Sequence, residues 1–278
     1  VINTNTAASI TANALTKNER AMSQAMERLS TGQRINNAGD DAAGLAISSK
    51  MTSQINGLNM AVRNANDAIS MVQTADGALI EIEAMLQRMR ELTVQGASGT
   101  YSSTDIGALA KEFEGLRDEI FRIGQNTQFN SKPLLDGDVD GSDDQIVSFQ
   151  VGANASQAIT VDFGEYETGE DMGTNFTTSL TISSNTDSGT ALGYVNTAIT
   201  NVNSQRAIFG AAINRLEYAA DNLSNTSQNV SASRSRVLDA DYAKETTELA
   251  RTQIIQQAAT AMLSQANQQA QSVLALLR

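Results

Sequence analysis

Acidic residues offer the clearest candidates for chemistry in this chain. The run Asp136–Gly141 matches the start of a calcium-binding loop, D-x-D-x-D-G, and Asp144 follows at the ninth position. Position twelve is Val147, where such a loop needs a bidentate glutamate. A pair of Asp-Gly turns in an acidic loop explains the same pattern. We therefore expect no metal site, while weak calcium binding by residues 136–147 stays open.

The adjacent carboxylates Asp40 and Asp41 are a second candidate, because paired carboxylates can perform acid–base catalysis. Their place directly before Ala42 and Ala43 also suits a helix N-cap, where a carboxylate accepts backbone N–H bonds and complements the helix dipole. No nucleophile or base stands nearby in sequence. We therefore expect a helix cap and no catalytic residue.

Missing residue types exclude much of the remaining enzyme chemistry. The chain has no His, Cys or Trp and a single Pro. It therefore lacks a Ser-His-Asp triad, a catalytic thiol, a disulfide framework and His or Cys ligands for zinc. A net charge of −12 disfavours nucleic-acid binding, and the sequence has no run of 18 apolar residues that could span a membrane. We expect no enzyme, no cofactor, and no nucleic-acid or membrane partner.

Two long helices are predicted to carry the core. Apolar residues recur at steps of three and four from Ile47 to Met89, which predicts a helix over about 42–97. A stripe spaced by seven runs from Val195 to Val237, and such heptads pack two helices along one seam. The predicted seam residues are Ile55, Leu58, Val62, Ile69, Leu79, Leu86, Val202, Phe209, Leu216, Leu223 and Val230. Polar exceptions in the second stripe are Arg206, Ser227 and Arg234.

Between the long helices the pattern predicts a short helix and a β-hairpin. The short helix runs from Asp105, near its N-cap, to Gly124, its C-terminal stop. Alternating apolar residues over 146–151 and 158–163, separated by a polar turn, predict the hairpin. A third strand is expected over 176–183. The fold class is therefore mainly α, a long antiparallel helical rod with a small β-hairpin region.

The two ends of the chain predict weaker helices. Ala8, Leu15, Met22 and Leu29 repeat by seven near the start, and Ile255, Met262, Gln269 and Leu276 near the finish. The residues around them are mostly Asn, Gln, Ser, Thr and Ala, so a single helix buries too little apolar surface to offset its ordering entropy. We expect both ends to be mobile in the isolated chain and helical when packed on each other or on neighbouring copies.

Several longer strings carry a family resemblance. In chain order they are INTN at 2–5, ERLSTG at 27–32, RIN at 34–36, DDAAGLAI at 40–47, RNAND at 63–67, RELTVQ at 90–95, NTQFN at 126–130, LDADYA at 238–243 and SVLALLR at 272–278. These strings resemble bacterial flagellin, the subunit of the flagellar filament, over roughly 1–163 and 190–278. One departure is the absence of a Pro shortly before the final leucines.

The resemblance implies a domain organisation. The terminal segments 1–41 and 239–278 would pair as an antiparallel coiled coil, and 42–238 would form the helical rod with its β-hairpin. Only the short acidic insert 164–189 lies where flagellins carry outer domains, which is too short for a domain with its own core. The resemblance therefore implies a short flagellin that self-assembles into the helical filament for swimming motility.

Site residues and partners follow from the same resemblance. Packing in the filament core is implied for Leu15, Met22, Leu29, Ile255, Met262, Val273, Leu274, Leu276 and Leu277. Arg88, Leu92 and Glu112 match the surface of flagellin monomers that Toll-like receptor 5, an innate immune receptor, recognises. Further implied partners are other copies of the chain, a flagellar export chaperone, and the filament cap and junction proteins. The implied location is extracellular, after export through the flagellar type III secretion channel.

Two other functions stay open at this stage. A hook–filament junction protein shares similar ends with flagellin, although the intact DDAAGLAI and TQFN strings favour a filament subunit. A secreted coiled-coil adhesin would share the helical pattern but would not polymerise by itself into long tubes.

Overall fold

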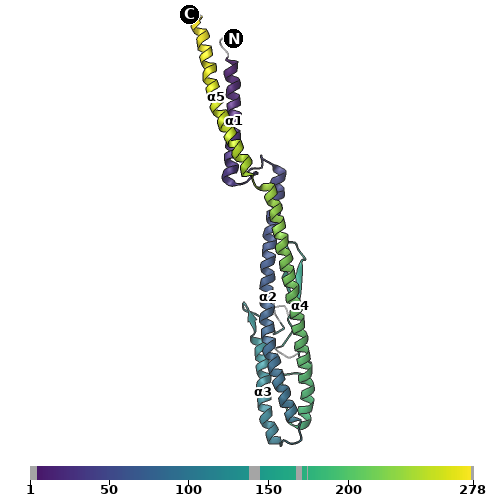
Figure 1. The fold of residues 1–278 in the computed structure, drawn as a ribbon. Helices are drawn as coiled ribbons and strands as arrows, with labels where there is room; N and C mark the ends of the chain where they lie inside the picture. Colours follow the sequence, from purple (N-terminus) through teal and green to yellow (C-terminus); the bar gives the residue numbers. More distant parts are fainter. Residues whose placement is uncertain (1–4, 138–144, 167–170, 174, 277–278) are drawn as a thin grey trace. The chain divides into compact units, whose positions relative to one another are not determined.

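The computed structural model describes residues 5–137, 145–166, 171–173 and 175–276, with side chains placed up to residue 268 (Figure 1). The elements in chain order are α1 (Thr6–Thr31), α2 (Ala42–Gly96), α3 (Ser103–Asn126), β1 (Gln128–Phe129), β2 (Lys132–Pro133), β3 (Ile146–Gln150), β4 (Ala158–Asp162), α4 (Asn185–Leu238) and α5 (Tyr242–Leu276). The mainly α fold with a small β-hairpin is confirmed. The chain forms two compact units, one of Val1–Ile55 with Gln228–Arg278 and one of Asn56–Ser227.

In the first unit, α1 and α5 lie side by side and run antiparallel (Figure 1). The Asn5 side chain caps α1 by accepting a hydrogen bond from the Ala8 N–H at 3.1 Å. At the other end Gly32 adopts a left-handed φ of 70° and donates to the Arg28 carbonyl, which closes the helix. The chain then passes through a short loop and enters α2 at Ala42.

In the second unit, α2 and α4 run antiparallel and α3 packs beside them (Figure 1). The long helix predicted over 42–97 is observed as Ala42–Gly96. The second long helix begins at Asn185, ten residues before the first apolar residue of its heptad stripe. The local signal is a serine cap, because the Ser184 Oγ accepts a hydrogen bond from the Asp187 N–H at 3.1 Å.

The limits of α3 differ from the prediction at both ends. Ser102 is the N-cap, and Asp105 sits three residues inside, where its carboxylate closes a capping box with Ser102. Asp105 therefore lies near the N-cap, as predicted, although the helix begins two residues earlier, at Ser103. Gly124 does not stop the helix, because it is a buried residue on the core-facing side and the helix continues to Asn126.

The predicted hairpin is confirmed as β3 and β4, which pair antiparallel with Ile146 opposite Asp162. The strand predicted over 176–183 is wrong, because none of these described residues is in a strand. Phe176 is buried and its ring centroid lies 6.0 Å from that of Phe121 on α3. The Leu180 carbonyl accepts a hydrogen bond from Arg117 of α3 at 2.6 Å, so the segment bonds to a helix and not to a sheet.

Candidate assembly and recognition surfaces

The paired carboxylates Asp40 and Asp41 are structural groups. The Asp41 Oδ1 accepts the Gly44 N–H at 2.8 Å and so caps α2, as predicted. The Asp40 Oδ2 accepts the backbone N–H groups of Asn37 at 3.0 Å and Asn36 at 3.1 Å, which lowers the pKa of this carboxyl below its ordinary value of 3.8. Both carboxylates are thus used in shaping the turn before α2.

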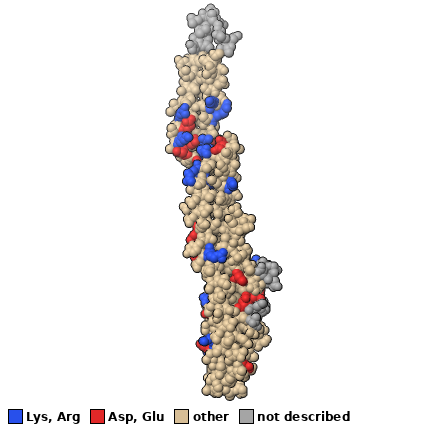
Figure 2. Space-filling view, turned by 90° about the vertical axis from the view of Figure 1, so that its right-hand side faces the viewer, with Lys and Arg blue, Asp and Glu red and all other residues tan. Residues whose placement is uncertain are grey.

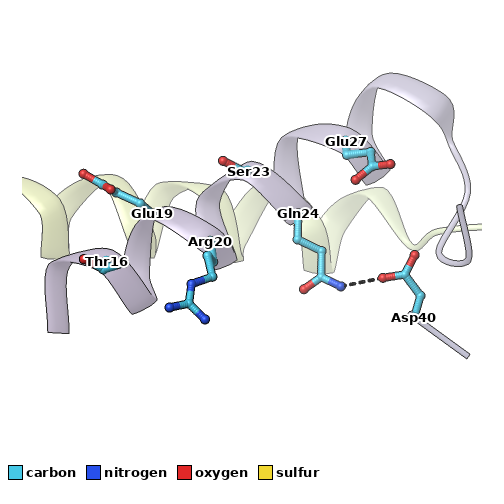
Figure 3. A pocket seen from close by; sticks show the side chains of 7 residues that line it. All are labelled: Thr16, Glu19, Arg20, Ser23, Gln24, Glu27 and Asp40. Carbon is cyan, nitrogen blue, oxygen red and sulfur yellow. Dashed lines mark hydrogen bonds between the residues drawn. The ribbon is translucent and has the colours of Figure 1, made fainter. Parts of the chain in front are cut away.

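An open groove of about 470 Å³ lies between α1 and this turn (Figure 3). Its lining residues are Thr16, Glu19, Arg20, Ser23, Gln24, Glu27 and Asp40. The Gln24 Nε2 donates a hydrogen bond across it to the Asp40 Oδ1 at 2.9 Å. Within the described ranges, no group of three or more acidic residues could hold a metal ion. The central part of the candidate calcium loop, residues 138–144, lies outside the described residues.

The α1–α5 pair buries few of the apolar residues that its sequence offers. Leu15, Met22 and Leu29 of α1 are half-buried. On α5, Ile255 and Met262 are 39% and 61% exposed, and so face outward. The side chains of Val273, Leu274 and Leu276 and all of Leu277 lie outside the described part of the structure.

A different set of α5 residues faces α1. Glu245 and Thr252 are buried, and Ala259 and Ala266 are half-buried, at a regular spacing of seven. The spacing of apolar residues predicts Ala259 and Ala266 at the seam but not Glu245 and Thr252, because these two most buried members of the face are polar. The seven-residue spacing of Glu245, Thr252, Ala259 and Ala266 was the available signal.

Other large apolar side chains of this unit are exposed. Ile10 on α1 is 68% exposed, and Ile254 on α5 is 66% exposed. These residues lie in segments 5–16 and 252–276, which contain no charged residue. On the face drawn in Figure 2, the charged side chains of this unit gather in one band and the described surface of its outer end is uncharged. Among the described helices, none is long and apolar enough to cross a membrane.

The predicted α2–α4 seam residues divide into two groups. Ile55, Leu58, Leu79, Leu86, Val202, Phe209 and Leu216 are buried, whereas Val62, Ile69, Leu223 and Val230 are half-buried. Leu79, Leu86, Val202 and Phe209 belong to one core cluster. The same cluster contains Phe163, whose ring centroid lies 5.5 Å from that of Phe209.

Each polar exception in the α4 stripe has a polar partner on α2. Arg206 bonds to Asp76 at 3.1 Å and also to Glu83, which raises the pKa of its guanidinium. In the same way, Ser227 bonds to Asn59 and Arg234 bonds to Thr52. These cross-helix bonds explain why polar residues stand at seam positions.

Of the three residues predicted for the receptor surface, Arg88 and Glu112 are exposed and Leu92 is buried. The Arg88 Nε donates to Glu112 of α3 and its Nη1 donates to Glu91, both at 2.8 Å. All three side chains are exposed, and the bonds raise the pKa of Arg88. Leu92 is 1% exposed and therefore lies beneath this surface, and its part in recognition stays a prediction. It faces the core because it continues the buried stripe of Leu86 and Met89.

Both helical ends of the chain match a known family. Residues 2–140 match the bacterial flagellin N-terminal helical region, and residues 192–277 match the bacterial flagellin C-terminal helical region. Together these matches cover well over half of the chain.

Whole proteins are also similar. The chain is 45% identical over 308 aligned residues to the flagellin of Bacillus subtilis, which covers 100% of this chain and 99% of that protein. It is 48% identical over 257 residues to the flagellin of Halalkalibacterium halodurans, covering 92% of this chain and 91% of that one. It is 40% identical over 287 residues to the flagellar filament 33 kDa core protein of Treponema phagedenis, covering 100% of both.

Solved structures share the fold. The crystal structure of Bacillus cereus flagellin superposes with a TM-score of 0.51 at 32% identity, covering 58% of this chain and 88% of that one. A putative flagellar hook-associated protein from Vibrio parahaemolyticus gives a TM-score of 0.59 at 14% identity, covering 72% of this chain and 100% of that one, and shows a shared fold alone. The chain therefore belongs to the bacterial flagellin family and is a structural subunit of the flagellar filament.

Proposed function

We propose that this flagellin polymerises by burying the uncharged part of its α1–α5 pair, residues 5–16 and 252–276, against neighbouring subunits. The observation that carries this proposal is the exposure of Ile10, Ile254 and Met262, at 68%, 66% and 61%, in segments without a charged residue. Burying one such side chain stabilises an assembly by about 1.5–3 kcal/mol. Because these segments have no charge, their burial carries no penalty for desolvating charged side chains.

Assembly of this kind is head-to-tail, and a repeated head-to-tail contact that does not close gives an open helical filament. Leu15, Met22, Leu29, Ile255, Val273, Leu274, Leu276 and Leu277 belong to the same proposed core. The proposed domains follow from it: 1–41 with 239–278 as the core layer, and 42–238 as the rod, which includes the acidic insert 164–189.

Seeded polymerisation tests the proposal. Purified monomer is mixed with short filament seeds in ammonium sulfate, and elongation is followed by light scattering and negative-stain electron microscopy. The double variant Ile254→Gln, Met262→Gln should raise the critical concentration by at least roughly tenfold, the factor that corresponds to about 1.4 kcal/mol. Ala250→Gln, which adds a glutamine at an exposed residue of the same helix outside the uncharged segment, is the control and should leave it unchanged. Elongation of the double variant just above the parent's critical concentration would overturn the proposal.

The same assay separates the other candidate functions. Steady growth into long uniform tubes supports a filament subunit. A hook–filament junction protein would add a few copies and stop, and a secreted coiled-coil adhesin would leave the seeds at their original length.

Export and assembly partners are part of the proposal. We infer that the ends, which consist largely of Asn, Gln, Ser, Thr and Ala, are unfolded in the monomer and pass in that state through the flagellar type III secretion channel. An export chaperone would hold the C-terminal helical region before export, and cap and junction proteins would meet the subunit at the ends of the filament outside the cell. Hydrogen exchange should then show α1 and α5 unprotected in the monomer and protected in the filament.

A second proposed activity is recognition of the monomer by Toll-like receptor 5 through the exposed Arg88–Glu112 pair. Leu92 would support this surface from below, since it is buried under the same stretch of α2. Arg88→Glu should lower the potency of monomer on receptor-expressing reporter cells by at least roughly tenfold, because it reverses the charge at the centre of the proposed contact.

The matched control for this test is Arg122→Glu, which removes an ion pair from the exposed face of α3. It should retain the parent's potency. Equal potency of the Arg88 and Arg122 variants would place the recognised surface elsewhere on the molecule.

A further inference from the structure

The seam between α1 and α5 is polar at positions where packed helices usually bury apolar side chains. Over the described residues of these two helices, the buried ones are Asn18, Ala25, Glu245 and Thr252. The Asn18 Nδ2 donates to the Thr252 carbonyl at 2.8 Å. Because apolar burial is small, apolar packing by itself discriminates weakly between alternative alignments of the two helices.

An ion pair lies at the inner end of this seam. The Arg28 Nη1 lies 3.2 Å from the Glu245 Oε1, with the two side chains 23% and 9% exposed. The Arg28 Nε is buried and has no hydrogen-bond partner in the described part of the chain. A buried pair that is incompletely satisfied recovers little of its desolvation cost, so it contributes little net stability. Its effect is greatest on alignments that would separate the two charges.

A slip of α5 along α1 would separate the charges of Arg28 and Glu245. A slip that keeps the same helix faces together moves one helix by seven residues. Glu245 would then lie opposite Ala21, or beyond Thr31, the last residue of α1. In either case a buried carboxylate loses its cation, which is far more costly than the loss of an exposed pair.

We propose that the Arg28–Glu245 pair sets the register between the N-terminal and C-terminal helices of each subunit in the filament. This inference rests on the proposed packing of α1 and α5 in the filament core. The pair selects one alignment from a small set that the Ala-rich and polar seam would otherwise accept, and so gives every subunit the same surface toward its neighbours. A single polar contact within a helical seam can specify register in this way.

Cysteine cross-linking in filaments can read the register directly, because the chain has no Cys of its own. The native pair is Asn5→Cys with Ala266→Cys, since the Asn5 Nδ2 lies 3.1 Å from the Ala266 carbonyl. The slipped pair is Asn5→Cys with Ala259→Cys, one heptad away. Filaments grown from seeds are oxidised, dissociated and run on a non-reducing gel, where cross-links within a subunit shift the monomer band and cross-links between subunits give dimers.

With Arg28 and Glu245 intact, only the native pair should cross-link within subunits. In the apolar double variant Arg28→Met, Glu245→Met, the slipped pair should cross-link at least roughly tenfold more than in the parent. The charge-swapped variant Arg28→Glu, Glu245→Arg should restore the native pair alone.

Two results would overturn the register role. One is exclusive native cross-linking in the apolar variant, and the other is failure of both double variants to assemble, because an ion pair of either orientation should set the same register. Assembly of the charge-swapped variant alone would support it. Failure of the parent chain to assemble on seeds would instead count against the proposed core packing, so the two ideas fail separately.

Discussion

Truncating Phe209 is the sharpest test of the packing that holds the second compact unit together. The side chain is 0% exposed, and its ring centroid lies 5.5 Å from that of Phe163. Replacing Phe209 by Ala removes a buried ring from the contact between α4 and the end of the hairpin. Because the long helices hold the backbone apart, the site collapses only in part, so the cavity adds to the lost burial. We expect the free energy of unfolding to fall by about 3–5 kcal/mol.

The assay is thermal and urea unfolding of the full chain followed by far-ultraviolet circular dichroism, because the chain has no Trp to report on its core. For a unit of roughly 170 residues each kcal/mol lowers the melting temperature by about 2–4 °C, so we expect a fall of about 6–20 °C. The matched control is Tyr218→Ala on the same helix, since Tyr218 is 76% exposed. It should change stability by less than about 0.5 kcal/mol.

A loss below about 1 kcal/mol for Phe209→Ala would refute this reasoning, because it lies well under the range for a fully buried aromatic ring. Equal losses for Phe209 and Tyr218 would refute it as well. In that case burial would not set the cost, and helix propensity could not explain it, because Ala is the better helix former at both positions.

Three further predictions concern polar groups and a close contact. Arg206→Met should lower stability by about 1–2 kcal/mol and reduce its salt dependence, since the bonds to Asp76 and Glu83 are lost; chemical denaturation at low and high salt measures both, and an unchanged salt dependence would contradict it. Gly57→Val should loosen the β3–β4 turn from α2, because even a Cβ atom there would lie 3.1 Å from a hairpin side chain; faster hydrogen exchange in the hairpin is the expected readout, and unchanged protection counts against it. Because the pKa of Asp40 is lowered in the folded state, its carboxylate stabilises the fold above pH 3.8, and this stabilisation is lost as the pH falls through the lower folded pKa. Asp40→Asn should therefore flatten the acid-unfolding profile below about pH 4. A profile identical to the parent's would contradict this expectation.

Much of the secondary structure could be predicted from the sequence, because helix and strand patterns arise from local spacing. The stripe from Ile47 to Met89 fixed α2 almost to the residue, and the alternation in β3 and β4 fixed the hairpin. The first residue of a helix is predicted less accurately where two capping residues compete. In α3, for example, Ser102 and Asp105 are both good caps, and only the backbone geometry shows which residue begins the helix.

The tertiary structure decided which face of each helix is buried. On α5 small and polar residues occupy several sides, so two different faces of the helix each show a repeat of seven. Contact with α1 buries the face of Glu245 and Thr252 and leaves the face of Ile255 and Met262 exposed. Similarly, Leu92 is enclosed because α2 has partners on more than one side there. Periodicity is a property of one chain segment and can be read from it, whereas burial is a property of two surfaces in contact. The sequence by itself thus determined the helices, the hairpin and the family, and the packing of the helices determined the polar register and the surfaces left for other subunits.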